Sequence, residues 1–542
     1  MGPGARRRTV VASPASEHDV QHTRSFPRGV VATPHHLASA AGLAILRAGG
    51  NAVDAAVAAN AVLGVVTPYY CGPGGDLFAI VVEPDGEVHA LESAGRTPAS
   101  MTLQSVLSAL PKPAPGRVPE VGALAVTVPG AVAGWATLQA RHGRFELGRV
   151  LEDAIAYARD GVPVSAHAAG AFDRSRLRFA GQASWQAAFG HVRAGGQLIQ
   201  PAHAAFLTTI ANDGPDALYG GSLGEQLAAF LQAEGSMMTV GDLAAHQVLD
   251  VTPLTTMYGD LEVLELPPPT QGVTALQALG VADRLRLADA DTWDADEVLR
   301  THLQIEAVRG ALVDRDQHVT DPDRMAFEAA ELVTPARLDS LASAVDRERA
   351  GTWPPATPAP GGTAYLCAAD DEGRTVSLIQ SNFMGFGSGL VAPFGVTLQN
   401  RGAQLSLDPN HINVVAPSVR TLHTLIPAVA RRGDKVVLTF GTMGGDGQPQ
   451  THLQLLDRLR RGVALQQAHA EWRFVVQPSD GLVIVEGRCP DAVVEGLRHR
   501  GHELHQLRDW DGMFGHAHAI ARTEHGWEAA SDPRAEGAAA GW

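Results

Sequence analysis

A run rich in proline and glycine, Pro354-Pro355-Ala356-Thr357-Pro358-Ala359-Pro360-Gly361-Gly362, ends abruptly at Thr363-Ala364-Tyr365-Leu366-Cys367-Ala368-Ala369, which is typical of a buried strand. The pattern predicts a flexible segment that delivers one hydroxyl to the head of a rigid element. It suits a precursor that is cut between Gly362 and Thr363, because the cut would leave Thr363 with both a nucleophile and a terminal amine. The alternative is an ordinary surface loop that enters a strand.

The residues after Thr363 favour the precursor. A tight turn at Asp370-Asp371-Glu372-Gly373 leads into a second predicted strand that ends at Ser381, followed by Asn382-Phe383-Met384-Gly385-Phe386-Gly387-Ser388-Gly389. This block resembles the gamma-glutamyltransferase family, whose members are N-terminal-nucleophile hydrolases. Further motifs follow the family order from about Gly29 to the end of the chain. They are Gly49-Gly50-Asn51-Ala52-Val53-Asp54-Ala55-Ala56, Thr127-Val128-Pro129-Gly130, Glu306-Ala307-Val308-Arg309 with Asp314-Arg315 and Asp321-Pro322, and Gly441-Thr442-Met443-Gly444-Gly445-Asp446-Gly447.

Composition narrows the class of protein. The 542 residues are 45% hydrophobic and 18% charged, which is enough to bury a large core. A formal charge of −16 argues against nucleic acid or an anionic membrane as the main partner, so a soluble enzyme with a small-molecule substrate fits better. The resemblance implies that this substrate is an amide, and we expect no cofactor. Three cysteines do not make a disulfide framework, and the basic start of the chain is followed by Ser16-Glu17-His18-Asp19 instead of the apolar core of a secretory signal. We therefore expect a cytoplasmic protein.

The order of predicted elements indicates an α+β fold. Strand patterns at both ends of the chain flank a largely helical region from about residue 135 to 350. The resemblance implies the four-layer αββα sandwich of the N-terminal-nucleophile hydrolases. We expect residues 1–27 to be a flexible leader, residues 28–362 to become a large subunit and residues 363–542 a small subunit. Both pieces are expected to form one domain as a heterodimer, with a dimer of heterodimers as a further possibility.

Three groups are candidates for the chemistry itself. The hydroxyl of Thr363 would attack an amide carbon, and its freed α-amine, with an unperturbed pKa near 7.7–8.0, would accept the proton. The resemblance implies that Ser381 supports this nucleophile and that Gly444 and Gly445 supply the oxyanion hole. The same two glycines would also make a tight turn after the preceding strand, and the two interpretations are compatible.

Substrate recognition is assigned through the resemblance. Arg96 is similar to the family arginine that clamps a substrate carboxylate, although it could be a surface arginine. Asn382 is displaced by one position from the family asparagine, so it either touches the substrate or bonds a local turn. Gln404 stands where transpeptidases carry an aspartate for the substrate ammonium, and His423-Thr424 replaces a Ser-Ser pair. These departures favour an acylase-like enzyme whose acyl donor lacks a free α-amine.

No metal site is predicted. Helical spacing of histidines can bind zinc, but no cysteine or Glu-x-x-His pattern completes a site here, so solvent-facing or hydrogen-bonded histidines are the simpler interpretation. The spacing in question involves His499, His502 and His505 on a predicted helix, and His516 and His518 on a predicted strand. The acidic residues Asp314, Asp316 and Asp321 fit helix ends and salt bridges better than a metal loop.

The sequence therefore predicts a self-processing amidohydrolase or acyltransferase that acts on a γ-glutamyl-like or dicarboxylic-acyl amide through an ester on Thr363. The first alternative is a glutathione hydrolase or transferase. The second, from another class, is an unprocessed, non-catalytic member of the family that binds amino-acid-like ligands.

Overall fold

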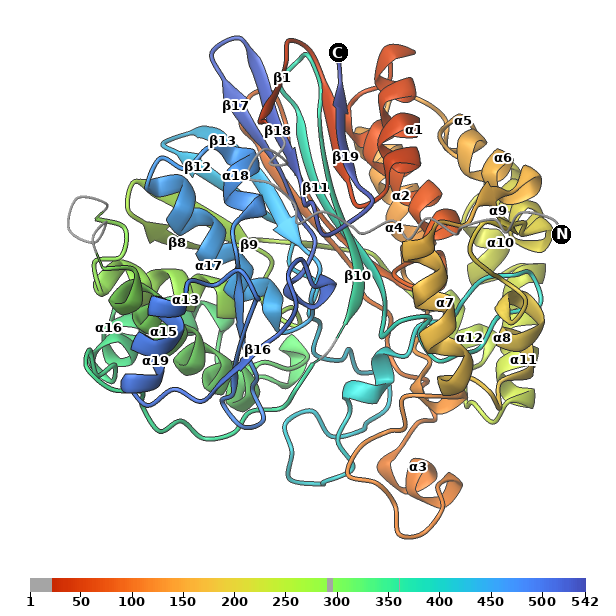
Figure 1. Cartoon of the computed structure of the whole chain (residues 1–542). Coiled ribbons are helices and arrows are strands. Elements are labelled where there is room, and N and C mark those ends of the chain that lie inside the picture. Colours follow the sequence, from red (N-terminus) through yellow and green to blue (C-terminus); the bar gives the residue numbers. More distant parts are fainter. Residues whose placement is uncertain (1–21, 290–295, 360) are drawn as a thin grey trace, which may run out of the picture.

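The computed structural model describes residues 22–289, 296–359 and 361–542. Two seven-stranded antiparallel sheets lie face to face, and helices cover the outer face of each sheet (Figure 1). This is the predicted four-layer αββα sandwich. Two smaller sheets accompany the main ones, formed by β14 (Phe474–Val476), β15 (Val483–Val485) and β16 (Leu504–Gln506), and by β5 (Val162–Pro163) and β6 (Gln197–Leu198).

The first large sheet contains the strand that starts at the Pro/Gly linker. In spatial order its strands are β19 (Ala538–Gly541), β2 (Val30–Thr33), β10 (Gly362–Ala369), β11 (Thr375–Phe383), β3 (Asp76–Val82), β4 (Val88–Ser93) and β7 (Leu249–Val251). The hairpin of β10 and β11 occupies its centre, with Ala364 opposite Gln380 and Gly362 opposite Phe383. A register shift between Gly362 and Ala364 marks the start of β10.

The second large sheet contains the strand that leads to the Gly444–Gly445 pair. Its strands, in spatial order, are β1 (Arg24–Phe26), β18 (Gly526–Ser531), β17 (Ala517–Thr523), β13 (Lys435–Thr442), β12 (Ala428–Arg432), β9 (Leu261–Glu265) and β8 (Leu254–Tyr258). Each large sheet combines strands from both sides of the predicted cut. The predicted large and small subunits therefore both contribute strands to each large sheet.

The layer between the sheets is apolar, because alternate residues of the facing strands point into it. Phe78, Tyr365, Ile379, Val429 and Ile520 are all buried there. The opposite face of the first sheet packs on α2 (Ala52–Val66), which is buried along its whole length. Asn51 begins this helix by accepting hydrogen bonds from the amides of Val53 and Asp54.

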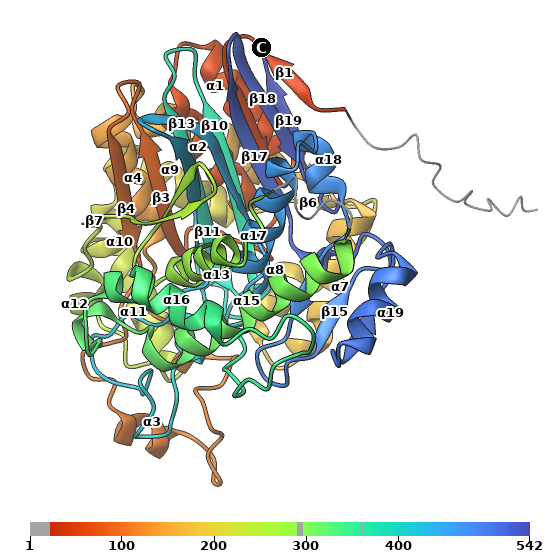
Figure 2. The same ribbon diagram turned by 90° about the vertical axis from the view of Figure 1, so that its left-hand side faces the viewer.

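Helices complete the two outer layers. On the first sheet lie α1 (His36–Arg47), α2, α4 (Ala131–His142), α5 (Leu147–Val150), α6 (Glu152–Asp160), α7 (Ala166–Arg178), α8 (Ala183–Phe189), α9 (Pro201–Asp213), α10 (Asp216–Tyr219), α11 (Ser222–Ala233) and α12 (Val240–Ala244), with α3 (Leu103–Ala109) at one end. On the second sheet lie α13 (Gly272–Arg284), α15 (Glu297–His318), α16 (Pro335–Ser343), α17 (Gly447–Arg460), α18 (Leu465–Ala470) and α19 (Asp491–His499), several of them in front of the strands in Figure 2.

Some sequence-based boundaries are wrong. The leader predicted over residues 1–27 extends too far, because Arg24–Phe26 pair with β18 as strand β1; residues 1–21 lie outside the described residues. The predicted helix through His499, His502 and His505 ends at His499, and His505 belongs to β16. Strand β1 could not be recognised in the sequence, because three residues are too few to show an alternating pattern.

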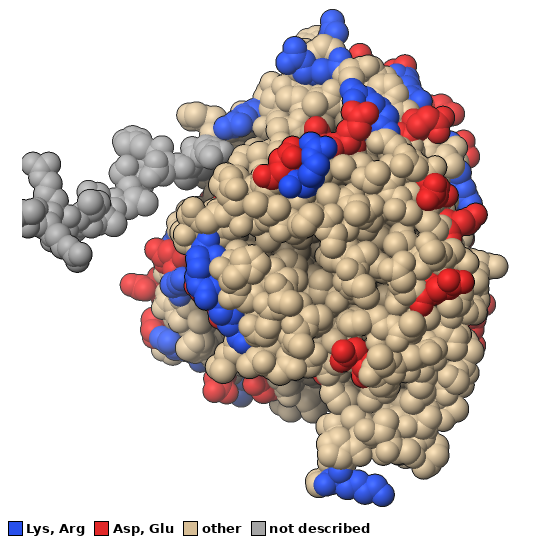
Figure 3. All heavy atoms as spheres, turned by 90° about the vertical axis from the view of Figure 1, so that its right-hand side faces the viewer, with Lys and Arg blue, Asp and Glu red and all other residues tan. Residues whose placement is uncertain are grey.

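The outer face of the first helical layer carries few charged side chains (Figure 3). Leu177, at the end of α7, is 86% exposed, and Ile199 is 49% exposed. No described helix is both long enough and apolar enough to cross a membrane.

Candidate active site

The hairpin brings Thr363 and Ser381 together at the start of β10. The Thr363 hydroxyl donates to Ser381 Oγ at 3.2 Å, and Ser381 Oγ donates to the Gly362 carbonyl at 2.6 Å. The Phe383 amide also donates to Ser381 Oγ, at 2.7 Å. One serine hydroxyl therefore accepts from the Thr363 hydroxyl and polarises the carbonyl of the Gly362–Thr363 bond. Both side chains are buried, so bulk water does not compete for these contacts.

The Gly444–Gly445 pair lies directly beside the linker. Gly444 has φ +136° and Gly445 φ +55°, conformations that L side chains rarely adopt. A Cβ added to Gly361 would lie 3.2 Å from Gly445 Cα, so the chain just before the predicted cut passes against this turn. The turn continues into the N-terminus of α17, where backbone amides and the helix dipole favour negative charge. The pair is placed where amides could stabilise an oxyanion.

A buried network fixes the glycine turn. Arg315 on α15 donates to Asp446 Oδ1 at 2.5 Å and to Gln271 Oε1 at 2.8 Å. The Gln271 amide group in turn donates to the carbonyls of Gly445, at 2.8 Å, and Thr424, at 3.1 Å. The sequence analysis identified this part of α15 only by motif. Its function in the structure is to hold the backbone that faces the Gly362–Thr363 bond.

The Pro/Gly linker is held in place, so the prediction that it is flexible is wrong for the uncut chain. Ala359 N donates to Asp446 Oδ2 at 2.6 Å, and Asp446 N donates back to the Ala359 carbonyl at 3.1 Å. The Thr357 carbonyl accepts from Arg315 at 2.8 Å. These partners lie far from the linker in sequence, so its composition alone suggests mobility that the folded chain does not have. Pro360 lies outside the described residues.

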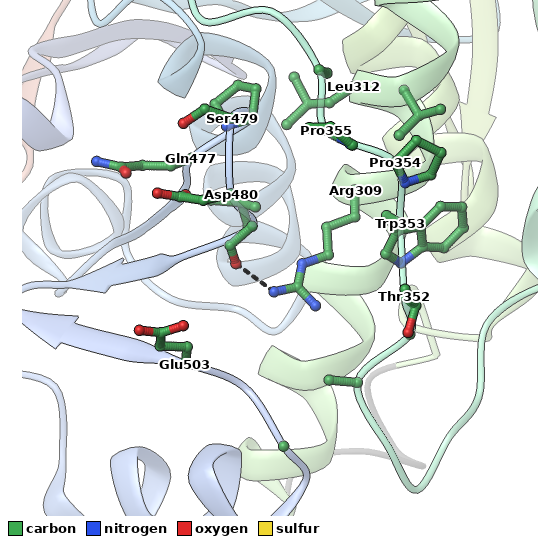
Figure 4. Close-up of a pocket in the computed structure, with 18 residues that line it drawn as sticks. Arg309, Leu312, Thr352, Trp353, Pro354, Pro355, Gln477, Ser479, Asp480 and Glu503 are labelled. Carbon is green, nitrogen blue, oxygen red and sulfur yellow. Dashed lines mark hydrogen bonds between the residues drawn. The ribbon is translucent and has the colours of Figure 1, made fainter.

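A pocket of about 480 Å³ opens where the linker begins (Figure 4). Trp353, Pro354 and Pro355 form one wall and a loop at residues 477–481 the other. Arg309 crosses the pocket and donates to the Gly481 carbonyl at 2.5 Å. Neither Thr363 nor Ser381 lines this pocket, so it is separate from the hydroxyl pair.

Two predicted recognition residues are already engaged by the protein. Arg96 donates to the Ser418 carbonyl at 2.8 Å and lies 3.3 Å from both Asp321 and Asp323. The Asn382 amide donates to Thr397 Oγ1 at 2.9 Å and to the Pro68 carbonyl at 3.4 Å. Thr397 and Pro68 lie 15 and 314 residues from Asn382 in sequence, so these are tertiary contacts and not the local turn that was the second sequence-based interpretation.

His423 is likewise committed to the scaffold. Its Nε2 lies 2.8 Å from Asp76 Oδ2, and its Nδ1 lies 2.8 Å from the Thr421 carbonyl. The other Asp76 oxygen accepts from the amides of Gly95, at 3.0 Å, and Gly130, at 3.2 Å. His423 thus has no free ring nitrogen for a substrate, whereas its neighbour Thr424 contacts the buried side chain of Arg401.

Arg401 was not among the site residues predicted from the sequence. It lies in the short 3₁₀ turn η5 (Arg401–Gln404), fully buried, with Nη1 3.4 Å from Thr424 Oγ1. Burial lowers the pKa of Arg401 to about 10, and nearby Asp76 opposes this shift, so the guanidinium stays charged at neutral pH. The signal was available in the sequence, because Arg401 stands three residues before Gln404 in the same block.

Two groups of described side chains have metal-ligand spacing. Glu83, His89 and His142 form one, and His302, Glu306 and His502 form the other. In the second group the Glu306 carboxylate already accepts from Arg309, at 3.0 Å, and from Trp353 Nε1, at 2.8 Å. Its oxygens therefore serve the ionic framework of α15, and neither group includes Thr363 or Ser381.

The stacked sheets, with Thr363 at the head of a central strand, define a fold of the N-terminal-nucleophile hydrolase class. A cephalosporin acylase from Bacillus halodurans has the same fold, with a TM-score of 0.90, 34% identity and coverage of 98% of this chain and 99% of that one. The chain matches gamma-glutamyltranspeptidase over residues 38–542 and belongs to this family.

Relatives within the family are proenzymes. The chain is 41% identical over 531 residues to the oxamate amidohydrolase proenzyme of Klebsiella pneumoniae, covering 95% of this chain and 98% of that protein. It is 35% identical over 529 residues to the glutathione hydrolase-like YwrD proenzyme of Bacillus subtilis, covering 94% and 98%. The predicted family, fold and enzyme class are confirmed, and the alternative of a non-catalytic ligand-binding member is set aside.

Proposed function

We propose that the protein is an amidohydrolase whose nucleophile is the Thr363 hydroxyl, released by self-cleavage of the Gly362–Thr363 bond. The observation that carries this proposal is the contact of Ser381 Oγ with both the Thr363 hydroxyl and the Gly362 carbonyl. Thr363 Oγ1 adds to the Gly362 carbonyl carbon, and the C–N bond breaks as the amine takes a proton. Water then hydrolyses the resulting ester, which leaves Gly362 as a carboxylate and Thr363 with a free α-amine.

The same groups serve the amide substrate. The Thr363 hydroxyl attacks the amide carbon and passes its proton to the α-amine, which returns a proton to the departing nitrogen. Amides of Gly444 and Gly445 stabilise the oxyanion of the tetrahedral intermediate. Water hydrolyses the ester on Thr363 and regenerates the hydroxyl. In the acyltransferase variant of this reaction an amine takes the place of water.

The proposed substrate is a small amide whose acyl group lacks an α-ammonium. Gln404 has no negative charge to pair with an ammonium, and the Arg96 guanidinium is occupied by its own acidic neighbours. The similarity to an oxamate amidohydrolase over nearly the whole chain supports an acyl donor of this kind. We propose oxamate-like monoamides of short dicarboxylic acids, which release ammonia or an amine.

Self-cleavage is tested on the purified protein. A denaturing gel should show fragments of about 38 and 19 kDa in place of the 56.8 kDa chain, and the smaller fragment should begin Thr-Ala-Tyr-Leu. Thr363→Ala should stay uncut and inactive, whereas Thr363→Ser should be cut because it keeps the hydroxyl. A fully active 56.8 kDa chain would contradict the proposal.

A glutathione hydrolase is the second candidate, favoured by the similarity to the YwrD proenzyme. The cut protein should be incubated with a γ-glutamyl anilide and a glutaryl anilide of the same leaving group. We expect faster release from the glutaryl compound, because it has the carboxylate and lacks the ammonium. Faster release from the γ-glutamyl compound would favour the second candidate.

We also propose that the two fragments remain together in the cytoplasm. Three buried cysteines without disulfide bonds fit a reducing compartment. The face shown in Figure 3 carries few charged side chains, and we propose it as the surface on which two heterodimers pair. Light scattering would distinguish a particle of about 57 kDa from one of twice that mass, and cell fractionation would test the location.

A further inference from the structure

Arg401 has an incomplete set of hydrogen bonds although no water reaches it. Its Nη1 lies 3.4 Å from Thr424 Oγ1, and its guanidinium carbon lies 4.3 Å above the Phe383 ring. Its Nε and Nη2 are buried without a partner. These two nitrogens form the edge of the guanidinium that binds a carboxylate through two parallel bonds.

Gln404 adds a further donor on the same turn. Its Nε2 is also buried without a partner. Because side chains three residues apart eclipse one another in a 3₁₀ turn, Arg401 and Gln404 project from the same side of η5. The turn therefore presents several N–H groups that lack an acceptor, which is the pattern expected of an anion site.

Arg401 is bracketed by residues of the reaction site. Phe383, beneath the guanidinium, lies opposite Gly362 in the hairpin and donates its amide to Ser381 Oγ. Thr424, which Nη1 approaches, shares the Gln271 amide group with Gly445. The guanidinium thus lies between the strand that carries Ser381 and the segment that supports the Gly444–Gly445 turn.

The protein itself does not neutralise this edge. Asp76 is the acidic group whose charge acts on Arg401. Its oxygens are occupied by His423, Gln399 and two backbone amides, and no hydrogen bond joins it to Arg401. A buried charged group with unsatisfied donors is unfavourable, so a carboxylate brought by a ligand would be bound strongly there.

We propose that Arg401 and Gln404 bind the free carboxylate of the acyl group and so determine that the substrate is an anionic amide. This inference rests on the proposed function and assigns the recognition of the carboxylate to Arg401 instead of Arg96. The carboxylate on Arg401 would fix the amide carbon against Thr363.

The test compares oxamate with oxamide, its neutral diamide, in wild type and in Arg401→Met, Arg401→Lys and Gln404→Met. We expect Arg401→Met to lower kcat/KM for oxamate by about 100-fold, mainly by raising KM. The same variant should change kcat/KM for oxamide by less than about threefold. Arg401→Lys should recover part of the loss, because it keeps the charge without the fork. Gln404→Met should lose about tenfold for oxamate only.

Arg458→Met is the matched control, because Arg458 is also buried but bonds the Ala468 and Trp472 carbonyls elsewhere in the fold. Arg458→Met should leave the ratio of kcat/KM for oxamate to kcat/KM for oxamide unchanged. Each variant is first checked for cleavage on a gel. Equal losses for both amides in Arg401→Met would overturn the proposal and make Arg401 a packing residue.

A binding measurement separates this proposal from the proposed function. Oxalate should raise the melting temperature of the cut wild type and should not raise that of cut Arg401→Met. If oxalate has the same effect on both, the carboxylate site is wrong even where turnover is observed. If oxalate acts as expected but no amide is hydrolysed, the proposed function fails and the binding site stands.

Discussion

The proposed reaction site has two regions, which differ in how many of their buried polar atoms have hydrogen-bond partners. Around the hairpin, Thr363, Ser381 and the Gly362 carbonyl form a closed set of hydrogen bonds. Around η5, Arg401 and Gln404 keep buried donors without acceptors. The difference fits the proposal that the catalytic groups are fixed in advance and that a ligand completes part of the recognition region.

Ser381→Ala gives the largest expected effect on the closed region. It removes the hydroxyl that donates to the Gly362 carbonyl and accepts from Thr363. We expect self-cleavage to slow by on the order of 100-fold, as is usual when one donor to a developing oxyanion is lost. The measurement is the rate at which the full-length chain disappears on a gel. Ser381→Thr keeps the hydroxyl and should be cut much faster than Ser381→Ala. Cleavage of Ser381→Ala at the wild-type rate would show that the Ser381 hydroxyl does not assist the attack of Thr363 on the Gly362 carbonyl.

Asp446→Asn tests the support of the glycine turn. The change removes a buried charge that pairs with Arg315 and accepts from Ala359 N. Unfolding free energy should fall by about 3 kcal/mol, because the Arg315 charge is left uncompensated. Denaturant unfolding measures the loss, and the double variant with Arg315→Met should lose less than the sum of the single variants. Additive losses would mean that the two side chains do not act together.

Acid should destabilise the protein through its buried histidines. Burial lowers the pKa of His518 and of His35 to about 3, below the ordinary value of 6.5. Between pH 6.5 and about 3 the unfolded chain binds more protons, so the stabilisation present above pH 6.5 is lost as pH falls, by about 1.4 kcal/mol per pH unit for each histidine.

His518→Leu tests this dependence, because it removes one such group. The slope of unfolding free energy against pH should become shallower by about one proton in that range. His499→Leu, at the exposed end of α19, is the control. An unchanged slope in His518→Leu would show that His518 takes up its proton while the protein is folded.

Arg96→Met should have the smallest effect. The Arg96 guanidinium is held by Ser418 and two acidic residues, and 39% of its side chain is exposed. Loss of such a partly exposed ion pair changes stability by about 1 kcal/mol or less and should change kcat/KM for oxamate by less than about threefold. A loss of 10-fold or more, without loss of cleavage, would place the substrate carboxylate on Arg96 and remove the contrast with Arg401.

The hairpin was predictable from sequence, whereas the network around it was not. Strand patterns and a short turn identify β10 and β11, and the family block places Ser381 near Thr363. The contacts Arg315–Asp446 and Ala359–Asp446 join residues 131 and 87 positions apart, and no local pattern reports such pairs. Arg401 could have been noticed beside Gln404, but only the folded chain shows that its donors have no acceptor.

Because strands from both sides of the predicted cut alternate in the two large sheets, a cut protein that has unfolded by heat should refold poorly. After a cut at the head of β10, neighbouring strands such as β2 and β10 belong to separate polypeptides. Once heat separates them, reassembly becomes a meeting of two molecules, each with exposed sheet edges prone to aggregation. The active form would thus be reached only by folding first and cutting afterwards, and its lifetime at high temperature would be governed by an unfolding rate.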